Sequence, residues 1–183
     1  MAMPLPVPTY TTDDLAAFPD DGCRYELVNG ILLVTPAPAH LHQAVLARLS
    51  AAIAGYLGSD GPGAAVSPGV IELAPSVHLE PDLLVYPAEF GPAVPWTDIK
   101  RWWLAVEVSG RSSRRYDRDY KRDAYLALGV AEVWLVDLEE KVVLVSRRDG
   151  PRDVRHTERL TWHPAAMAVP LELDLTRLFC GLP

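Results

Sequence analysis

The sequence is poor in cysteine and lacks the patterns that mark several common enzyme classes. Its two cysteines, Cys23 and Cys180, are too few for a disulfide framework, and neither belongs to a CxxC pair or a histidine cluster. The five histidines show no HxxxH or HExxH spacing, which excludes a typical zinc hydrolase. No GxSxG, GxGxxG or GxxxxGKS/T motif is present, so the commonest signals of serine hydrolases and nucleotide-binding loops are missing.

Long apolar runs are also missing. No run approaches the roughly 20 residues that a helix needs to cross a bilayer. The first residues, MAMPLPVPTYTTDD, contain neither a basic region nor an apolar core, so we expect no secretory signal. With so few cysteines, the cytoplasm is the expected compartment.

The composition that is present fits one globular domain. Apolar residues make up 49% of the 183 residues, enough for a substantial core at this length. The net charge of −7 argues against a protein that blankets nucleic acid by electrostatics alone. The charge is uneven, however. One short segment concentrates the cations Arg111, Arg114, Arg115, Arg118, Lys121 and Arg122. Such a local basic patch can accept a phosphate.

The N-terminal half predicts a short helix, a hairpin, a long helix and further strands. Residues 1–9 are proline-rich and predict an extended N-terminal arm. TTDDLAAF predicts a capped helix, and RYELVNGILLVTP predicts a hairpin that turns at Asn29-Gly30. HLHQAVLARLSAAIAGYLG predicts a long amphipathic helix that ends at Gly58, with Leu41 on its apolar face. Short strands follow in AAVSPGVIELAP and PDLLVYP.

The C-terminal half continues this mixed order. RWWLAVEV predicts a buried strand, RYDRDYKRDAYLALG an amphipathic helix closed by Gly129, and AEVWLVD with KVVLVSRR a second hairpin. A strand near RLTW and a closing element in LELDLTRLF complete the chain. The order predicts an α/β (α+β) fold: a single domain over residues 10–183 with a mixed central β-sheet flanked by helices.

Two acidic residues stand at strand ends. Asp82 opens one apolar strand, and Glu107 lies near the end of another. If these strands are antiparallel neighbours, both carboxylates converge on one edge of the sheet and need a cation between them. Mg²⁺ or Mn²⁺ is the usual solution where a phosphate is the substrate. A solvated strand end is the simpler reading for either acid alone. Glu107 fits that reading less well, because its neighbours are apolar.

Lys121 lies on the following helix. Asp117, Lys121, Tyr125 and Leu128 share one face of that helix, which would bring Lys121 out at the rim of the sheet. Its ammonium group could there orient a water molecule or stabilise a pentacovalent phosphate. A surface ion pair between Asp117 and Lys121 is the competing interpretation, and spacing alone favours it.

Several segments together show a resemblance. YELVNG, PAPAHLHQAV, PDLLV and LAVEVSGRSSRRYDRDYKRDAYLALGVAEVWLVD occur in this order over residues 10–148. The sequence thereby resembles the Uma-two family, in the restriction-endonuclease-like superfamily with the PD-(D/E)xK signature. The most specific block is the last, in which Glu107, Asp117, Lys121 and Tyr125 all fall at the family's spacing.

The resemblance implies roles for individual residues. Asp82 and Glu107 would be metal ligands, and Glu26 would complete the ligand set or help to position water. The superfamily lysine usually stands two residues beyond the acid, where this chain has Ser109, and Lys121 on the next helix would replace it. From the strand pattern alone, Glu26 reads as an outward-facing residue.

Other residues would lie around this centre. His42 and Gln43 match a recurring pair at the start of the long helix and would be adjacent to the site, as would Asp117 and Tyr125. From position alone, His42 reads as a structural hydrogen-bonding residue. The basic turn would bind flanking phosphates through Arg111, Arg114, Arg115 and Arg118. The family usually has a Ser-Pro-Ser-like turn after its acid, whereas this sequence has SGRSS.

The implied activity is metal-dependent hydrolysis of phosphodiester bonds in nucleic acid, with DNA the expected substrate and Mg²⁺ or Mn²⁺ the cofactor. One alternative is a non-catalytic nucleic-acid-binding or assembly protein that keeps the fold. Loss of an acid or of the lysine would mark it, and all of them are present. Another is an intact metal site that serves a different substrate or depends on a partner protein for specificity. A homodimer or higher homo-oligomer is expected, because in a dimer each strand of a duplex would meet one site. The hairpin EVWLVDLEEKVVLVS or the N-terminal arm could form its interface.

Overall fold

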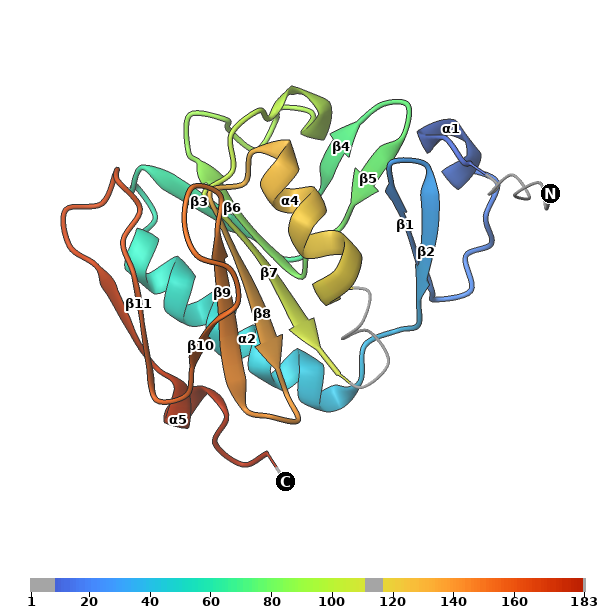
Figure 1. The fold of residues 1–183 in the computed structure, drawn as a ribbon. Helices are drawn as coiled ribbons and strands as arrows, with labels where there is room; N and C mark the ends of the chain where they lie inside the picture. The colour runs from blue at the N-terminus through green and yellow to red at the C-terminus, as the bar shows by residue number, and fades with distance from the viewer. Residues whose placement is uncertain (1–8, 111–116, 183) are drawn as a thin grey trace.

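The computed structural model describes residues 9–110 and 117–182, and its centre is a mixed β-sheet (Figure 1). This six-stranded sheet has the order β10-β9-β8-β7-β6-β3. β7 and β8 run parallel, whereas the other neighbouring pairs are antiparallel. The strands of this sheet are β3 (Gly63–Val66), β6 (Leu83–Pro87), β7 (Leu104–Ser109), β8 (Glu132–Asp137), β9 (Val142–Arg147) and β10 (Val154–His156). The predicted mixed sheet is thus confirmed.

A smaller sheet with the order β2-β1-β5-β4 packs beside it. Its hairpin of β1 (Arg24–Val28) and β2 (Ile31–Thr35) turns at Asn29 and Gly30, whose φ angles of 50° and 80° fit a tight two-residue turn. Its other strands are β4 (Ile71–Leu73) and β5 (Val77–Leu79). A further pair consists of β11 (Arg159–Trp162) and β12 (Leu171–Asp174). The sequence did not predict β5 or β10, because strands of three residues show no clear alternation.

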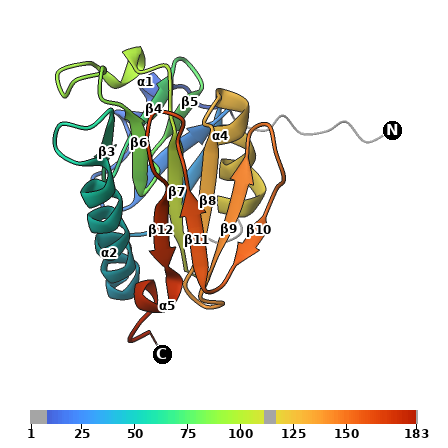
Figure 2. The ribbon, with the colours of Figure 1, turned by 90° about the vertical axis from the view of Figure 1, so that its left-hand side faces the viewer.

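Helices cover both faces of the central sheet. Figure 2 shows α2 (His40–Leu57) on one side and α4 (Arg122–Leu128) on the other. The remaining short helices are α1 (Thr12–Leu15), η1 (Trp96–Asp98) and α5 (Leu175–Leu178). Within the described part of the chain, no helix is long and apolar enough to cross a membrane.

Alternate residues of the central strands belong to two separate hydrophobic cores. Leu83, Val85 and Val106 point toward α2, whereas Leu84 and Ala105 belong to the core under α4 and the smaller sheet. This alternation follows from the strand period of two. It also decides on which side the polar residues at the strand ends must lie.

The segment before α4 differs from the prediction of one regular α-helix. Residues Asp117–Lys121 form a π-helical turn, which continues into α4. Its two end residues are buried, whereas the three residues between them are exposed. π-Helical turns of this kind occur frequently at functional sites. The end of the helix is as predicted, with Gly129 at a φ of 101°.

The β8–β9 hairpin, one of the two predicted dimer interfaces, is largely buried within the chain. The β8–β9 hairpin exists, but β8 is paired on both sides and all of its residues are buried. β9 is covered at its other edge by β10. The apolar side chains of this hairpin therefore form core within one chain. The homodimer itself stays a prediction. Its alternative interface, the N-terminal arm, falls largely on residues 1–8, outside the described residues.

Candidate active site

Asp82 and Glu107 stand opposite each other on neighbouring strands. β6 and β7 are antiparallel, with Leu83 paired to Val106 and Leu84 to Ala105. One step further along this register, Asp82 comes opposite Glu107. Because Leu84 and Ala105 face α4, the two acids two positions away face the same side. The prediction that these strands are antiparallel neighbours is confirmed.

Asp82 is held by donors from three directions. Its Oδ2 accepts a hydrogen bond from the backbone N–H of Val108 at 2.8 Å and lies 2.9 Å from Nε2 of His42. Its Oδ1 accepts from Nη1 of Arg24 at 3.1 Å. Burial alone would raise the pKa of Asp82, but these partners outweigh burial and lower it. Asp82 therefore carries a negative charge at neutral pH.

Glu107 lies deeper and among like charges. It is 2% exposed, and its Oε1 accepts hydrogen bonds from the Tyr125 hydroxyl at 2.5 Å and from Lys121 Nζ at 3.3 Å. Burial raises the pKa of Glu107 well above its usual value, and the Lys121 charge only partly opposes this. Repulsion from neighbouring carboxylates, Asp82 among them, raises it further. Its Oε2 accepts no hydrogen bond from the described residues, which leaves that oxygen available to a ligand.

Lys121 is buried rather than placed at the rim. It is 1% exposed, and its Nζ lies 2.5 Å from Oε2 of Glu26, 3.3 Å from Oε1 of Glu107 and 3.7 Å from Oδ1 of Asp117. Asp117 is itself 2% exposed, so the interpretation as a surface ion pair is wrong. Burial would lower the pKa of Lys121, but the three carboxylates raise it. The group stays an ammonium ion.

Glu26 reaches the centre from the smaller sheet. Its side chain is fully buried, so the reading as an outward strand residue is wrong. Its Oε1 accepts from the backbone N–H of Glu80 at 2.8 Å, and its Oε2 meets Lys121. Burial raises the pKa of Glu26, and the Lys121 charge opposes that rise. Glu26 thus anchors the lysine.

A cavity of about 500 Å³ opens onto this cluster. Its polar lining consists mainly of Arg24, His42, Asp82, Glu107, Asp117 and Lys121. Glu26 does not line the cavity and sits behind Lys121. The arrangement places three carboxylates, an ammonium group and a guanidinium group around one cavity.

The family model described as "Putative restriction endonuclease" (Uma2) matches residues 12–177. The chain belongs to the Uma2 family. This family assignment supports a nuclease at a coarse level.

A solved structure is also similar, the crystal structure of "a putative nuclease belonging to DUF820 from Anabaena variabilis ATCC 29413". It aligns with a TM-score of 0.77 and 18% identity, covering 94% of this chain and 99% of the other. At this identity the likeness concerns the fold, and it confirms the restriction-endonuclease-like class. No curated protein matches the chain.

The structure brings together most of the residues that the Uma2 resemblance implied. His42 contacts Asp82, and Tyr125 contacts Glu107. Gln43, in contrast, is exposed on α2 and does not line the cavity. Of the implied phosphate-binding residues, Arg111, Arg114 and Arg115 lie outside the described residues.

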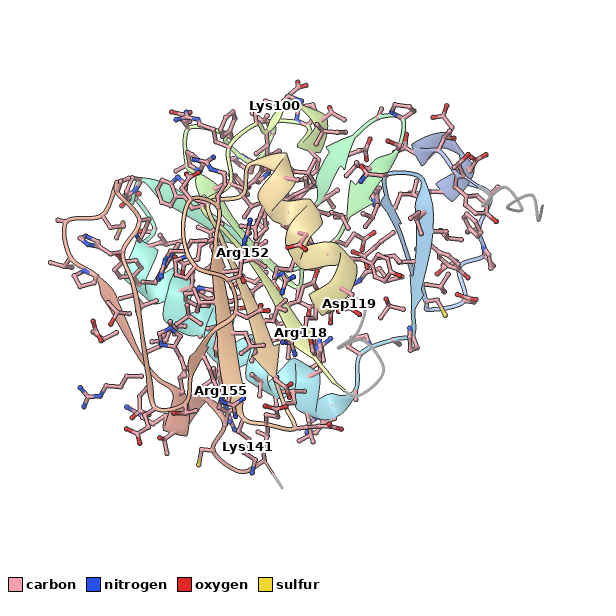
Figure 3. The ribbon with its side chains drawn as sticks, viewed as in Figure 1. Lys100, Arg118, Asp119, Lys141, Arg152 and Arg155 are labelled. Carbon is pink, nitrogen blue, oxygen red and sulfur yellow. The ribbon has the colours of Figure 1, made fainter. Side chains whose placement is uncertain are left out.

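Arg118 lies on the side of the molecule that carries α4. In Figure 3 it is below Arg152 and above Arg155. Its side chain is 53% exposed and lies 3.7 Å from Oδ2 of Asp153. This is an exposed and loose ion pair, so a phosphate could compete for the guanidinium group.

Two contributors were missed from the sequence. Arg24 binds Asp82, and its position two residues before Glu26 on β1 was the available signal, since such residues share a strand face. Ser109 stands where the superfamily lysine is usual, and its hydroxyl donates to Oδ2 of Asp117 at 2.7 Å. This bond ties the end of β7 to the π-helical turn.

The donor set of this Uma2 chain fits magnesium better than zinc. Among the residues that the structure describes, no three histidine, cysteine or acidic side chains are grouped to hold an ion by themselves. Mg²⁺ needs no such cage, because it binds through one or two carboxylates and keeps several water molecules. Asp82 is ionised and faces the cavity, and Glu107 has an oxygen without a hydrogen-bond donor. These two residues would hold the ion.

Proposed function

We propose that this protein is a Mg²⁺- or Mn²⁺-dependent nuclease that hydrolyses phosphodiester bonds in nucleic acid, with DNA the expected substrate. The observation that carries the proposal is the placement of Asp82 opposite Glu107, with Lys121 buried beside them at one cavity. The family assignment supports a nuclease at the same coarse level.

Asp82 and Glu107 would hold the metal ion. Different neighbouring side chains position the two carboxylates. Arg24 and His42 keep Asp82 ionised and fixed in orientation. Tyr125 fixes one oxygen of Glu107 and leaves the other toward a ligand. When bound, the ion supplies positive charge against phosphate oxygens and lowers the pKa of water.

Lys121 would stabilise negative charge as water attacks phosphorus and the bond to the leaving sugar oxygen breaks. Its contact with Glu26 is 2.5 Å, whereas its contact with Glu107 is 3.3 Å. Glu26 is therefore the nearer anchor, and it holds the ammonium group at the lining of the cavity. Glu26 serves as a positioning residue, because it touches Lys121 and does not line the cavity.

The deciding experiment combines metal binding with cleavage on the same samples. Calorimetry with Mg²⁺ and Mn²⁺ and nicking of supercoiled plasmid are measured on wild type, Asp82→Asn, Glu107→Gln and Lys121→Met. Matched controls are Glu172→Gln on β12 and the exposed Lys100→Met, both away from the cavity. We expect both acid variants to lose metal binding, Lys121→Met to keep it, and all three to lose about 100-fold or more in nicking rate.

A folded wild-type protein that neither binds these ions nor nicks plasmid would contradict the proposal. If it still bound nucleic acid, the non-catalytic alternative would be favoured. For cleavage of both strands of a duplex, the proposal expects a homodimer with one site for each strand. Sedimentation of the wild-type protein with and without duplex measures this directly.

A further inference from the structure

The groups proposed to react lie at the floor of the cavity. Asp82, Glu107 and Lys121 are 3%, 2% and 1% exposed, and all three line the cavity. A phosphodiester must therefore enter the cavity to reach them.

The first wall of the cavity is apolar and stiff. It consists of the segment 36–39, Pro-Ala-Pro-Ala, and of Leu41 in the first turn of α2. Two prolines restrict the backbone of this segment to extended conformations. Leu41 was predicted to lie on the buried face of its helix. It is instead 39% exposed, because it borders the cavity.

The second wall is formed by Leu138, Glu139 and Leu182, and hydrogen bonds fix its backbone. Asp137 Oδ1 accepts from the backbone N–H groups of Glu139 and Glu140, at 3.0 and 2.9 Å, which orders the β8–β9 turn. The carbonyl of Leu182 accepts from Lys141 Nζ at 3.1 Å.

The C-terminal segment that carries Leu182 is held a second time. Arg48 of α2 donates from Nη1 to the carbonyls of Leu178 and Cys180, at 2.8 and 2.7 Å. Helix α2 and the β8–β9 turn thus both fasten this segment. The second wall is a built part of the cavity rather than a passing contact.

A charged floor between two mainly apolar walls, with Glu139 the acidic residue of the second, matches the chemistry of one nucleotide. The phosphate meets charged groups at the floor, and the base and sugar meet the walls. In a duplex the bases are stacked and paired inside the helix, so a nucleotide must first leave the stack to enter an enclosed site. A single strand has no such requirement.

We infer that the site takes one unpaired nucleic-acid strand, whether free single strand, frayed end or locally opened duplex, with a base or sugar against the Leu41 and Leu138 walls. This inference rests on the proposed nuclease function and specifies its substrate class. A small apolar phosphodiester is the competing occupant.

Binding is measured by fluorescence polarisation with a labelled single-stranded DNA of about 12 nucleotides, a range typical of such sites. The same sequence as blunt duplex and as RNA is compared, with Mg²⁺ present. The Lys121→Met protein serves as host, so that binding is read without cleavage. We expect the single strand to bind about tenfold more tightly than the duplex, since base contacts are then available.

Leu41→Gln and Leu138→Gln, each placed in that host, test the walls. Both side chains are at least partly exposed, so glutamine is compatible with folding, and thermal melting verifies this. Leu73→Gln is the matched control, because Leu73 is 36% exposed on β4 and lies outside the cavity. We expect each wall variant to weaken single-strand binding about fivefold, with no effect of the control.

Equal affinity for duplex and single strand, or wall variants without effect, overturns the inference. Hydrolysis of bis(p-nitrophenyl) phosphate without any oligonucleotide binding also overturns it, in favour of the small phosphodiester. Cleavage by wild type then separates the two proposals. Wall-dependent binding of single strands without cleavage of any substrate supports the inference and defeats the nuclease proposal. Equal cleavage of single-stranded and duplex DNA, unchanged by the Leu41 and Leu138 substitutions, supports the nuclease proposal and overturns the inference.

Discussion

Lys121 and Glu26 form a 2.5 Å ion pair between two side chains that are almost completely excluded from solvent. One comes from the π-helical turn before α4, and the other comes from β1 of the smaller sheet. The pair therefore joins the smaller sheet to the helical segment that follows β7, at the place where the proposed chemistry occurs. Breaking it has consequences for stability as well as for function.

Glu26→Gln removes one partner of this pair and leaves an incompletely compensated buried ammonium group. We expect the free energy of unfolding to fall by about 3 kcal/mol, as for other broken buried pairs. Urea unfolding monitored by tryptophan fluorescence measures it. Glu26→Gln combined with Lys121→Met should be more stable than Glu26→Gln alone. A single variant within about 0.5 kcal/mol of wild type would show that the pair contributes little.

His42→Asn tests whether orientation of Asp82 matters for metal binding. The variant loses the contact between Nε2 and Asp82 Oδ2, while the Val108 amide and Arg24 remain. We expect Mg²⁺ affinity to fall by about tenfold, the range seen when groups behind a ligand are removed. Calorimetry provides the measurement, and His163→Asn, at an exposed histidine, provides the control. Unchanged affinity would limit His42 to a packing role.

A pH-dependent contribution to stability is expected from His78, on β5. Its Nε2 lies 3.1 Å from Glu80 and its Nδ1 lies 3.0 Å from Glu72. The bond with Glu80 raises the pKa of His78 above its ordinary 6.5; burial opposes this, and Glu72 adds to the rise. The pKa of Glu80 is lowered from 4.5, mainly by His78. Stability from His78 is therefore fully present below pH 6.5 and is lost as pH rises through the folded-state pKa. The contribution of Glu80 to stability is present above pH 4.5 and is lost as pH falls through its lowered pKa.

His78→Gln should thus be more destabilising at about pH 5.5 than at about pH 9, by about 0.5 kcal/mol because the pair is partly exposed. Thermal or urea unfolding of both proteins at the two pH values measures the difference. An equal loss for His78→Gln at both would mean that the histidine charge is not involved.

Arg118→Gln addresses the phosphate-binding role of the described part of the basic segment. Arg118 lies close to the start of α4, whereas Lys100 lies at the top edge of the molecule in Figure 3. We expect Arg118→Gln to weaken binding of all oligonucleotide sequences alike and to reduce the slope of log affinity against log salt by about one. Lys100→Gln should leave that slope unchanged. A sequence-dependent loss would instead point to a base contact.

The strands and helices that frame the site were predictable because their signals are local. Short continuous apolar runs predicted β6 and β7, and the Asn29-Gly30 turn predicted the β1–β2 hairpin. The burial of Lys121 was not predictable from spacing, because a surface ion pair and a buried cluster share the same helical interval. The difference is made by Glu26, which is distant in the chain and reaches Lys121 only through the packing of two sheets. The position of Leu41 was wrong for a similar reason, since periodicity does not reveal where a helix extends past its sheet.

Glu107 stands two residues before Ser109 on β7, and Lys121 stands four residues after Asp117 in the π-helical turn. The hydrogen bond from the Ser109 hydroxyl to Asp117 therefore acts as a brace between the strand that carries the carboxylate and the turn that carries the ammonium group. Through this brace, a serine that touches neither Glu107 nor Lys121 helps to set the 3.3 Å spacing between them.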